Sequence, residues 1–186
     1  MSVYADPAID NLVKIDQNHA LLVQSLVMCR KPRKVLEIGF GAGEATKAIL
    51  AGLRYNRTPI DYTVVDNWMD FGGAQPAATR TEEFGGINFI TSDEFAFVAN
   101  CQTIYDFIFS DADHLNTQLW FEHVYGKLLS REGILIYHDV TNSAMFPNLM
   151  TIYTDTIKNN YHHVLMNQNS FPGERCDRGL LVIFKH

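Results

Sequence analysis

Features that would place this chain in a membrane or in an oxidising compartment are missing from the sequence. No apolar run is long enough to cross a bilayer as a helix. The first residues, MSVYADPAIDN, contain acids and no apolar core, so we expect no secretory signal. The three cysteines, Cys29, Cys101 and Cys176, are far apart, and no pair has metal or redox spacing. Separated thiols in odd number favour a reducing compartment, so we expect a cytoplasmic protein.

An excess of basic residues is missing as well. The formal net charge is −6, which argues against a nucleic-acid backbone or an anionic membrane as the main partner. The chain has 186 residues, of which 47% are hydrophobic, and it contains no repeat and no low-complexity tract. These values are typical of one globular domain with its own core. We therefore expect a single domain over residues 1–186 with no nucleic-acid or membrane partner.

Strand and helix patterns alternate along the chain. Apolar residues recur at mostly helical spacings over residues 7–30, and Pro32 ends that segment. After it, short apolar runs alternate with amphipathic stretches. The predicted strands are 34–38, 61–66, 87–91, 105–111, 133–139, 162–166 and 179–185, and the predicted helices between them are 44–53, 93–100, 115–129 and 146–160.

This alternation predicts an α/β fold with a mostly parallel, seven-stranded sheet and helices on both faces. The last two strands are too close in sequence for a helical crossover, so they must be antiparallel. The sequence therefore predicts a doubly wound sheet with a reversed C-terminal strand. Residues 33–186 form its core, and residues 1–32 form a helical N-terminal segment.

Acidic residues stand at or near the ends of four predicted strands. Asp66, Asp111 and Asp139 close the second, fourth and fifth strands, and Glu37 lies near the end of the first. Ligands of doubly wound sheets bind outside the carboxyl ends of the strands. We therefore expect these four acids at one ligand-binding edge.

A glycine-rich turn follows the first strand, in VLEIGFGAGEAT at residues 35–46. Gly39, Gly41 and Gly43 give the spacing G-x-G-x-G, whereas the dinucleotide fingerprint is G-x-G-x-x-G. Glu44 stands where the third dinucleotide glycine would be, and no Walker lysine is present. Glu37 beside the loop would repel a phosphate and would suit a cationic ligand. The loop therefore predicts a nucleoside ligand with a cationic tail and no phosphate.

LEIGFGAG and the VVD that ends at Asp66 resemble the first two motifs of the class I S-adenosylmethionine-dependent methyltransferases. The resemblance covers roughly residues 30–186, implies a Rossmann-like fold, and includes the final antiparallel strand pair. It implies that the glycines face the amino-acid part of the cofactor, with Glu37 close beneath, and that Asp66 binds the ribose. Ser92 and Asp93 would flank the adenine, although capping of the helix at 93–100 explains them equally well. Asp111 would lie near the methionine portion.

Residues 105–140 resemble the corresponding region of small-molecule O-methyltransferases of the catechol, caffeoyl-coenzyme A and macrocin types. The DADH sequence from Asp111 and the pair His138-Asp139 carry this resemblance. It implies that Asp111, His138 and Asp139 are catalytic and bind a divalent cation, which holds a substrate hydroxyl beside the methyl group.

The histidine in this pair departs from the acidic and amide residues of those families. Imidazole suits zinc, iron, manganese or cobalt better than magnesium. One alternative is therefore a transition-metal site at Asp111, His138 and Asp139. The other is a metal-free site in which His138 is a general base oriented by a carboxylate, a role that His114 could also fill.

These resemblances imply an enzyme that transfers a methyl group from S-adenosylmethionine to a small-molecule acceptor, with a hydroxyl oxygen as the expected acceptor atom. Two other functions stay open. The chain could be a methyltransferase-like module that binds without turnover, or a nicotinamide-dependent oxidoreductase, which Glu44 disfavours. Residues 67–86 and 167–178 are the expected substrate loops, and small domains of this type often form homodimers.

Overall fold

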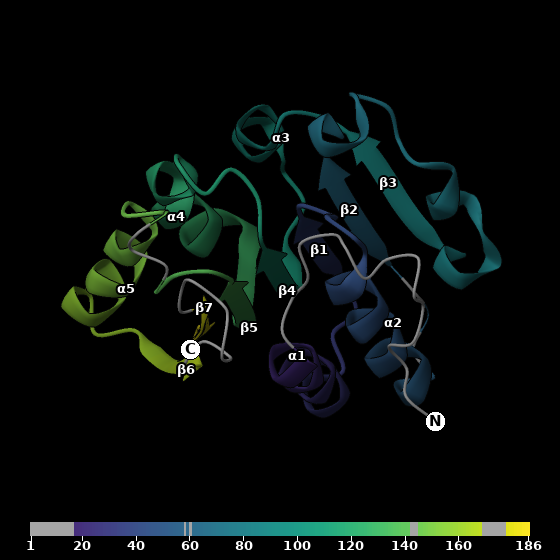
Figure 1. Ribbon diagram of the computed structural model, residues 1–186. Helices are drawn as coiled ribbons and strands as arrows, with labels where there is room; N and C mark the ends of the chain where they lie inside the picture. Colours follow the sequence, from purple (N-terminus) through teal and green to yellow (C-terminus); the bar gives the residue numbers. More distant parts are fainter. Residues whose placement is uncertain (1–16, 58, 60, 142–144, 169–177) are drawn as a thin grey trace.

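The computed structural model of the protein describes residues 17–186 except residues 58, 60, 142–144 and 169–177 (Figure 1). Its strands are β1 (Val35–Ile38), β2 (Tyr62–Asp66), β3 (Ile87–Thr91), β4 (Tyr105–Ser110), β5 (Leu129–Tyr137), β6 (His162–Gln168) and β7 (Arg178–Phe184). Its helices are α1 (Gln17–Arg30), α2 (Glu44–Asn56), α3 (Glu94–Asn100), α4 (Phe121–His123) and α5 (Leu149–Lys158). The part of the expected N-terminal helix before Gln17 lies outside the described residues.

The seven strands form one sheet in the order β3-β2-β1-β4-β5-β7-β6. Strands β1 to β5 pair in parallel, whereas β7 runs antiparallel to both β5 and β6. The predicted doubly wound, Rossmann-like sheet with a reversed C-terminal strand is therefore confirmed. The strand order changes direction between β1 and β4, which is where ligands bind in sheets of this kind.

Helices cover both faces of the sheet. On one face, Val23 of α1 and Ile49 of α2 share a buried cluster with Phe107 of β4. On the other face, Val98 of α3 and Ile152 of α5 belong to a second buried cluster. Figure 1 shows α1 and α2 together on one side, and α4 and α5 on the other. None of the helices in the described residues is long and apolar enough to span a membrane.

The predicted helix at 115–129 is present over residues 117–128, although only its central turn has α-helical hydrogen bonding. It consists of a 3-10 turn (Thr117–Trp120), the single turn α4 and a π turn (Val124–Leu128), and β5 then begins at Leu129. Lys185, just past β7, donates from Nζ to the backbone oxygens of Tyr125, Gly126 and Leu129 at 2.7, 3.1 and 2.8 Å. Lys185 thereby satisfies carbonyls at the C-terminal end of this helical segment.

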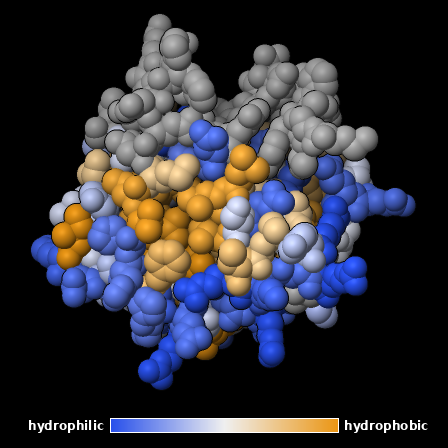
Figure 2. Space-filling model, turned by 90° about the horizontal axis from the view of Figure 1, so that it is seen from below, coloured by the Kyte–Doolittle hydropathy of each residue, from blue (hydrophilic) through white to orange (hydrophobic). Residues whose placement is uncertain are grey.

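An apolar surface gathers on the face of the molecule that Figure 2 shows from below. Helix α1 and strand β6 lie at that end of the molecule in Figure 1, and each exposes an apolar side chain, Leu21 and Val164 respectively. The pairing of two copies of the chain stays a prediction.

Candidate active site at the carboxyl ends of the parallel strands

In the loop between β1 and α2, three glycines have positive φ, and they differ in how much space surrounds them. Gly39 has φ +91°, and a Cβ there would overlap the backbone of Asp111 and approach the Cβ of Ala112 to 2.8 Å. Only glycine therefore lets β1 and the end of β4 come this close. Gly43 has φ +79° and packs under the ring of Phe40, whereas Gly41 has φ +52° and faces open space. The open side of Gly41 leaves bare backbone for a ligand.

Asp66, at the end of β2, ties this loop to the neighbouring strand. Its Oδ2 accepts a hydrogen bond from the Phe40 backbone N–H at 2.7 Å, and its Oδ1 accepts one from the Trp68 N–H at 2.6 Å. Each carboxylate oxygen has two lone pairs, so each keeps one for a further donor. Asp66 can therefore hold the loop and still bind two ligand hydroxyls.

A cleft of about 230 Å³ opens at this edge of the sheet, where the strand order changes direction. Of the predicted site residues it brings together Gly39, Gly41, Asp66 and Asp111. Asp70, Glu94 and Asp113 also line the cleft, and neither lysine nor arginine does so in the described part of the chain. The lining is therefore negative, which favours a cationic ligand over a pyrophosphate.

Glu37 is fully buried beneath the loop and is absent from the lining of the cleft. Its carboxyl oxygens lie 3.0 and 2.9 Å from the Thr46 hydroxyl, and Oε2 also accepts from the Tyr62 hydroxyl. Burial raises the pKa of Glu37 to about 8. Glu37 therefore joins β1, α2 and β2 to one another, and any effect on a ligand in the cleft must be indirect.

Beyond β3, the predicted residues Ser92 and Asp93 do not line the cleft. Asp93 caps α3, because its Oδ1 accepts from the Ala96 backbone N–H at 2.9 Å. Ser92 donates to the backbone oxygen of Asp93. The next residue, Glu94, is the one that lines the cleft, and burial raises its pKa. The sequence analysis missed Glu94, although it follows the same strand end.

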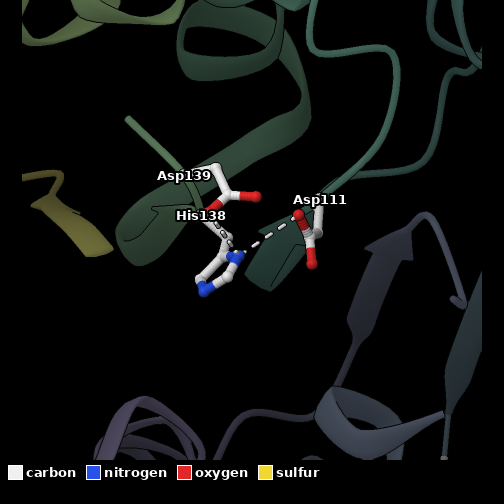
Figure 3. A group of neighbouring side chains, drawn as sticks. All are labelled: Asp111, His138 and Asp139. Carbon is white, nitrogen blue, oxygen red and sulfur yellow. Dashed lines mark ion pairs between the residues drawn. The ribbon is translucent and has the colours of Figure 1, made fainter. Parts of the chain in front are cut away.

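The ends of β4 and β5 bring the predicted catalytic residues together (Figure 3). His138 Nδ1 lies 3.3 Å from Asp111 Oδ1 and 3.6 Å from Asp139 Oδ1. His114 Nε2 lies 3.1 Å from Asp111 Oδ1 and 3.4 Å from Asp139 Oδ2. Two carboxylates and two imidazoles therefore form one cluster at the cleft. His138 is only 3% exposed, whereas His114 lines the cleft and packs against Phe146, with the two rings tilted by 30°.

The carboxylates attract positive charge into this cluster. Burial alone would lower the pKa of both histidines, but Asp111 and Asp139 raise it to about 10 for His138 and about 9 for His114. Burial alone would raise the pKa of both carboxyl groups, but the two rings lower it, to about 2 for Asp139 and further for Asp111. The cluster can therefore hold protons or a metal cation.

Two ligand-type atoms of the cluster are buried without a hydrogen bond to any described residue. They are His138 Nδ1 and Asp139 Oδ1. Together with Asp111 they offer three donor atoms within 4.8 Å of one another. Buried polar atoms normally have a partner, and a bound cation would supply it. The predicted metal residues therefore fit a cation.

A residue that the sequence analysis missed lies behind this cluster. His19 of α1 is fully buried, and its Nδ1 lies 3.2 Å from His138 Nε2. The two residues are 119 positions apart in the sequence, so no local motif links them. The only local signal is that His19, Val23 and Val27 recur at helical spacing on the buried face of α1.

The two expected substrate loops differ in how far the structure describes them. Residues 67–86 form three 3-10 turns, and Phe71 and Phe84 from this segment pack on the core. A second cavity of about 280 Å³ lies between them and the glycine loop. Within the segment 167–178, residues 169–177 lie outside the described residues.

Comparisons with known proteins point to one family. The family described as "Methyltransferase domain" matches residues 36–140, which include the glycine loop and both strand ends of the cluster. No curated protein matches the chain.

Solved structures share the fold at low sequence identity. An O-methyltransferase from Bacillus cereus in complex with SAH is 17% identical, covers 100% of this chain and 94% of its own length, and has a TM-score of 0.71. The O-methyltransferase TomG from Streptomyces achromogenes, in complex with SAM, is 12% identical, covers 100% and 93%, and has a TM-score of 0.70. The N-methyltransferase NodS from Bradyrhizobium japonicum is 15% identical, covers 97% and 98%, and has a TM-score of 0.64.

Proposed function

Since this chain belongs to the family of methyltransferase domains, we propose that it transfers the methyl group of S-adenosylmethionine to a small-molecule acceptor. The observation that carries the proposal is the acidic cleft beside the bare backbone of Gly41. S-adenosylmethionine has a cationic sulfur and an ammonium group and no phosphate, whereas NAD has a pyrophosphate. The charge of the cleft lining therefore favours the first cofactor.

The cofactor would lie across the switch point of the sheet. Gly39 and Gly41 would let the backbone approach its amino-acid part, and Asp66 would accept hydrogen bonds from the two ribose hydroxyls with its remaining lone pairs. Glu94 lies on the adenine side, next to the previously expected Ser92 and Asp93. Gly43 and Glu37 support the loop from beneath.

Asp111, His138 and Asp139 would hold a divalent cation at the other side of the cleft. Two carboxylates with one imidazole suit manganese, iron, cobalt or zinc better than magnesium. When bound, such a cation supplies positive charge that stabilises a deprotonated hydroxyl. This chemistry supports oxygen as the acceptor atom, as in the solved structures described as O-methyltransferases.

If no metal takes part, an imidazole must accept the proton of the acceptor. His138 is poorly placed for this, because it is 3% exposed and its Nε2 faces His19. His114 lines the cleft, and its Nε2 lies between Asp111 and Asp139. In a metal-free site, His114 is therefore the base that we propose, and because its pKa is raised to about 9, the neutral ring that can accept a proton becomes common only as pH rises toward that value. In either case the acceptor oxygen bonds to the methyl carbon as the carbon–sulfur bond breaks, and the sulfur leaves as a neutral thioether.

Calorimetry tests the cofactor first. S-adenosylhomocysteine should bind in the micromolar range, about −8 kcal/mol, and NAD should not bind comparably. Tight binding of NAD with no binding of either adenosyl ligand would contradict the proposal. Binding without product across a panel of hydroxylated acceptors would instead favour a non-catalytic binding module.

Chelation then separates the two catalytic alternatives. If a metal is used, a chelator should abolish methyl transfer, and manganese, cobalt or zinc should restore it better than magnesium. If His114 is the base, activity should survive chelation, and His114→Ala should be nearly inactive while it still binds S-adenosylhomocysteine.

A further inference from the structure

The buried pair of His19 and His138 joins the N-terminal helix to the catalytic cluster. His19 Nδ1 and His138 Nε2 are 3.2 Å apart, and the two rings are nearly perpendicular, at 82°. Both side chains are almost completely buried, at 0% and 3% exposed. His19 is therefore not exposed to a ligand in the cleft, and its contact with His138 links it to the cluster.

The position of the carboxylates decides which nitrogen donates in this pair. A hydrogen bond between two imidazoles needs one N–H and one bare nitrogen. His138 Nδ1 faces Asp111 and Asp139, so a metal ion held by these three residues would occupy the lone pair of Nδ1 and leave the ring proton on Nε2. The proton on His138 Nε2 then points at His19 Nδ1. In Figure 3 this second nitrogen points away from both carboxylates.

We propose that His19 is a positioning residue that keeps the Nδ1 of His138 directed at Asp111 and Asp139, and so prepares His138 as a metal ligand. The inference rests on the proposed function of the site. Metal-binding histidines normally donate their other N–H to an acceptor, which fixes the tautomer and the orientation of the ring. Without an acceptor at position 19, the Nε2–H of His138 would be buried without that partner, and the ring could turn.

Helix α1 is suited to this task because it is held rigidly. Val23 and Val27, one and two turns after His19, are fully buried in the cluster that α1 shares with α2 and the sheet. The matched family region begins at residue 36, so His19 lies outside it. The ligand geometry at the end of β5 thus depends on a helix that precedes the matched part of the chain.

Binding of Co²⁺ to the full chain, freed of metal by a chelator, tests the proposal. Calorimetry and visible absorption should show Co²⁺ binding to the unaltered protein. His19→Leu removes the acceptor and should weaken Co²⁺ binding about 10- to 100-fold, the usual cost of losing such a partner. His19→Asn keeps an acceptor oxygen near the place of Nδ1 and should bind Co²⁺ within about threefold of the unaltered protein. Both variants should bind S-adenosylhomocysteine normally.

Three results would overturn the inference. They are unchanged Co²⁺ affinity in His19→Leu, equal loss in His19→Leu and His19→Asn, and no Co²⁺ binding by the unaltered protein. None of these affects the methyl-transfer proposal, which depends on S-adenosylhomocysteine binding and product formation. Should His19→Leu fail to fold, ¹⁵N NMR of the Zn²⁺-loaded unaltered protein gives an independent test. The proton of His138 must then be on Nε2, and a proton on Nδ1 would refute the proposal.

Discussion

The buried carboxyl group of Glu37 connects three elements of the fold beneath the candidate ligand site. Both of its oxygens are within 3.0 Å of the one hydroxyl of Thr46, which carries only one proton. The hydroxyl can contact both oxygens favourably when the carboxyl group is itself protonated and donates to it. Burial raises the pKa of Glu37 to about 8, which agrees with a neutral group at moderate pH.

Glu37→Gln should change how the stability of the protein depends on pH. The pKa of Glu37 is about 8 in the folded state and near 4.5 in the unfolded chain, so the folded state binds the extra proton between these values. Its contribution to the free energy of unfolding is therefore full below pH 4.5 and falls as pH rises toward 8, by up to about 1.4 kcal/mol per pH unit. Urea denaturation at pH 5 and pH 8 should show a smaller decrease in the variant. Glu82→Gln, which removes an exposed carboxyl group, is the control, and parallel pH curves for Glu37→Gln and the unaltered protein would refute the expectation.

At the scale of strands and helices, the sequence predicted what depends on local pattern. The apolar runs marked all seven strands, and parallel topology sends Asp66, Asp111 and Asp139 to one edge. It failed where distant residues decide. The amphipathic pattern at 115–129 predicted a helix, which is present over residues 117–128, but the pattern could not predict its mixed 3-10, α and π turns or its contact with Lys185 at the other end of the chain. His19 could not be assigned a role, because its partner His138 is 119 residues away.

Lys185→Met should weaken the C-terminal end of the helical segment that precedes β5. The ammonium group of Lys185 donates to three backbone carbonyls, and methionine keeps the apolar stem while removing the donor. We expect a loss of about 1–2 kcal/mol in the free energy of unfolding, measured by urea denaturation, because those carbonyls lose a charged partner. Lys158→Met removes an exposed ion pair with Asp155 on α5 and should cost less than about 0.5 kcal/mol. Equal effects of the two changes would show that Lys185 only lies near these carbonyls.

Across the whole molecule, the sheet divides the proposed chemistry between its two halves. Strands β1, β2 and β3 supply the glycine loop, Asp66 and the region of Glu94, whereas β4 and β5 supply Asp111, His138 and Asp139. The halves meet at β1 and β4, where Gly39 packs against the backbone of Asp111. This close contact would bring a cofactor on one half beside an acceptor on the other, with Asp111 at the boundary, because it lines the cleft and also belongs to the group proposed to hold the metal.

Two variants, one in each half, should therefore have opposite effects on binding. Asp66→Ala removes the carboxylate proposed to bind the ribose and should weaken S-adenosylhomocysteine binding by roughly 1.5–3 kcal/mol, with Co²⁺ affinity unchanged. His138→Ala removes a proposed metal ligand and should abolish Co²⁺ binding, with S-adenosylhomocysteine affinity within about threefold. Titration calorimetry of each variant with each ligand measures all four affinities.

Asp93→Ala is the control for Asp66→Ala. Asp93 is also an acid near a strand end that accepts a backbone hydrogen bond, but it caps α3 outside the cleft. Its loss should cost about 1 kcal/mol of stability and leave both affinities intact. If either site variant lost both ligands while remaining folded, the two halves would form one interdependent site, and the proposed division between cofactor and metal would be wrong.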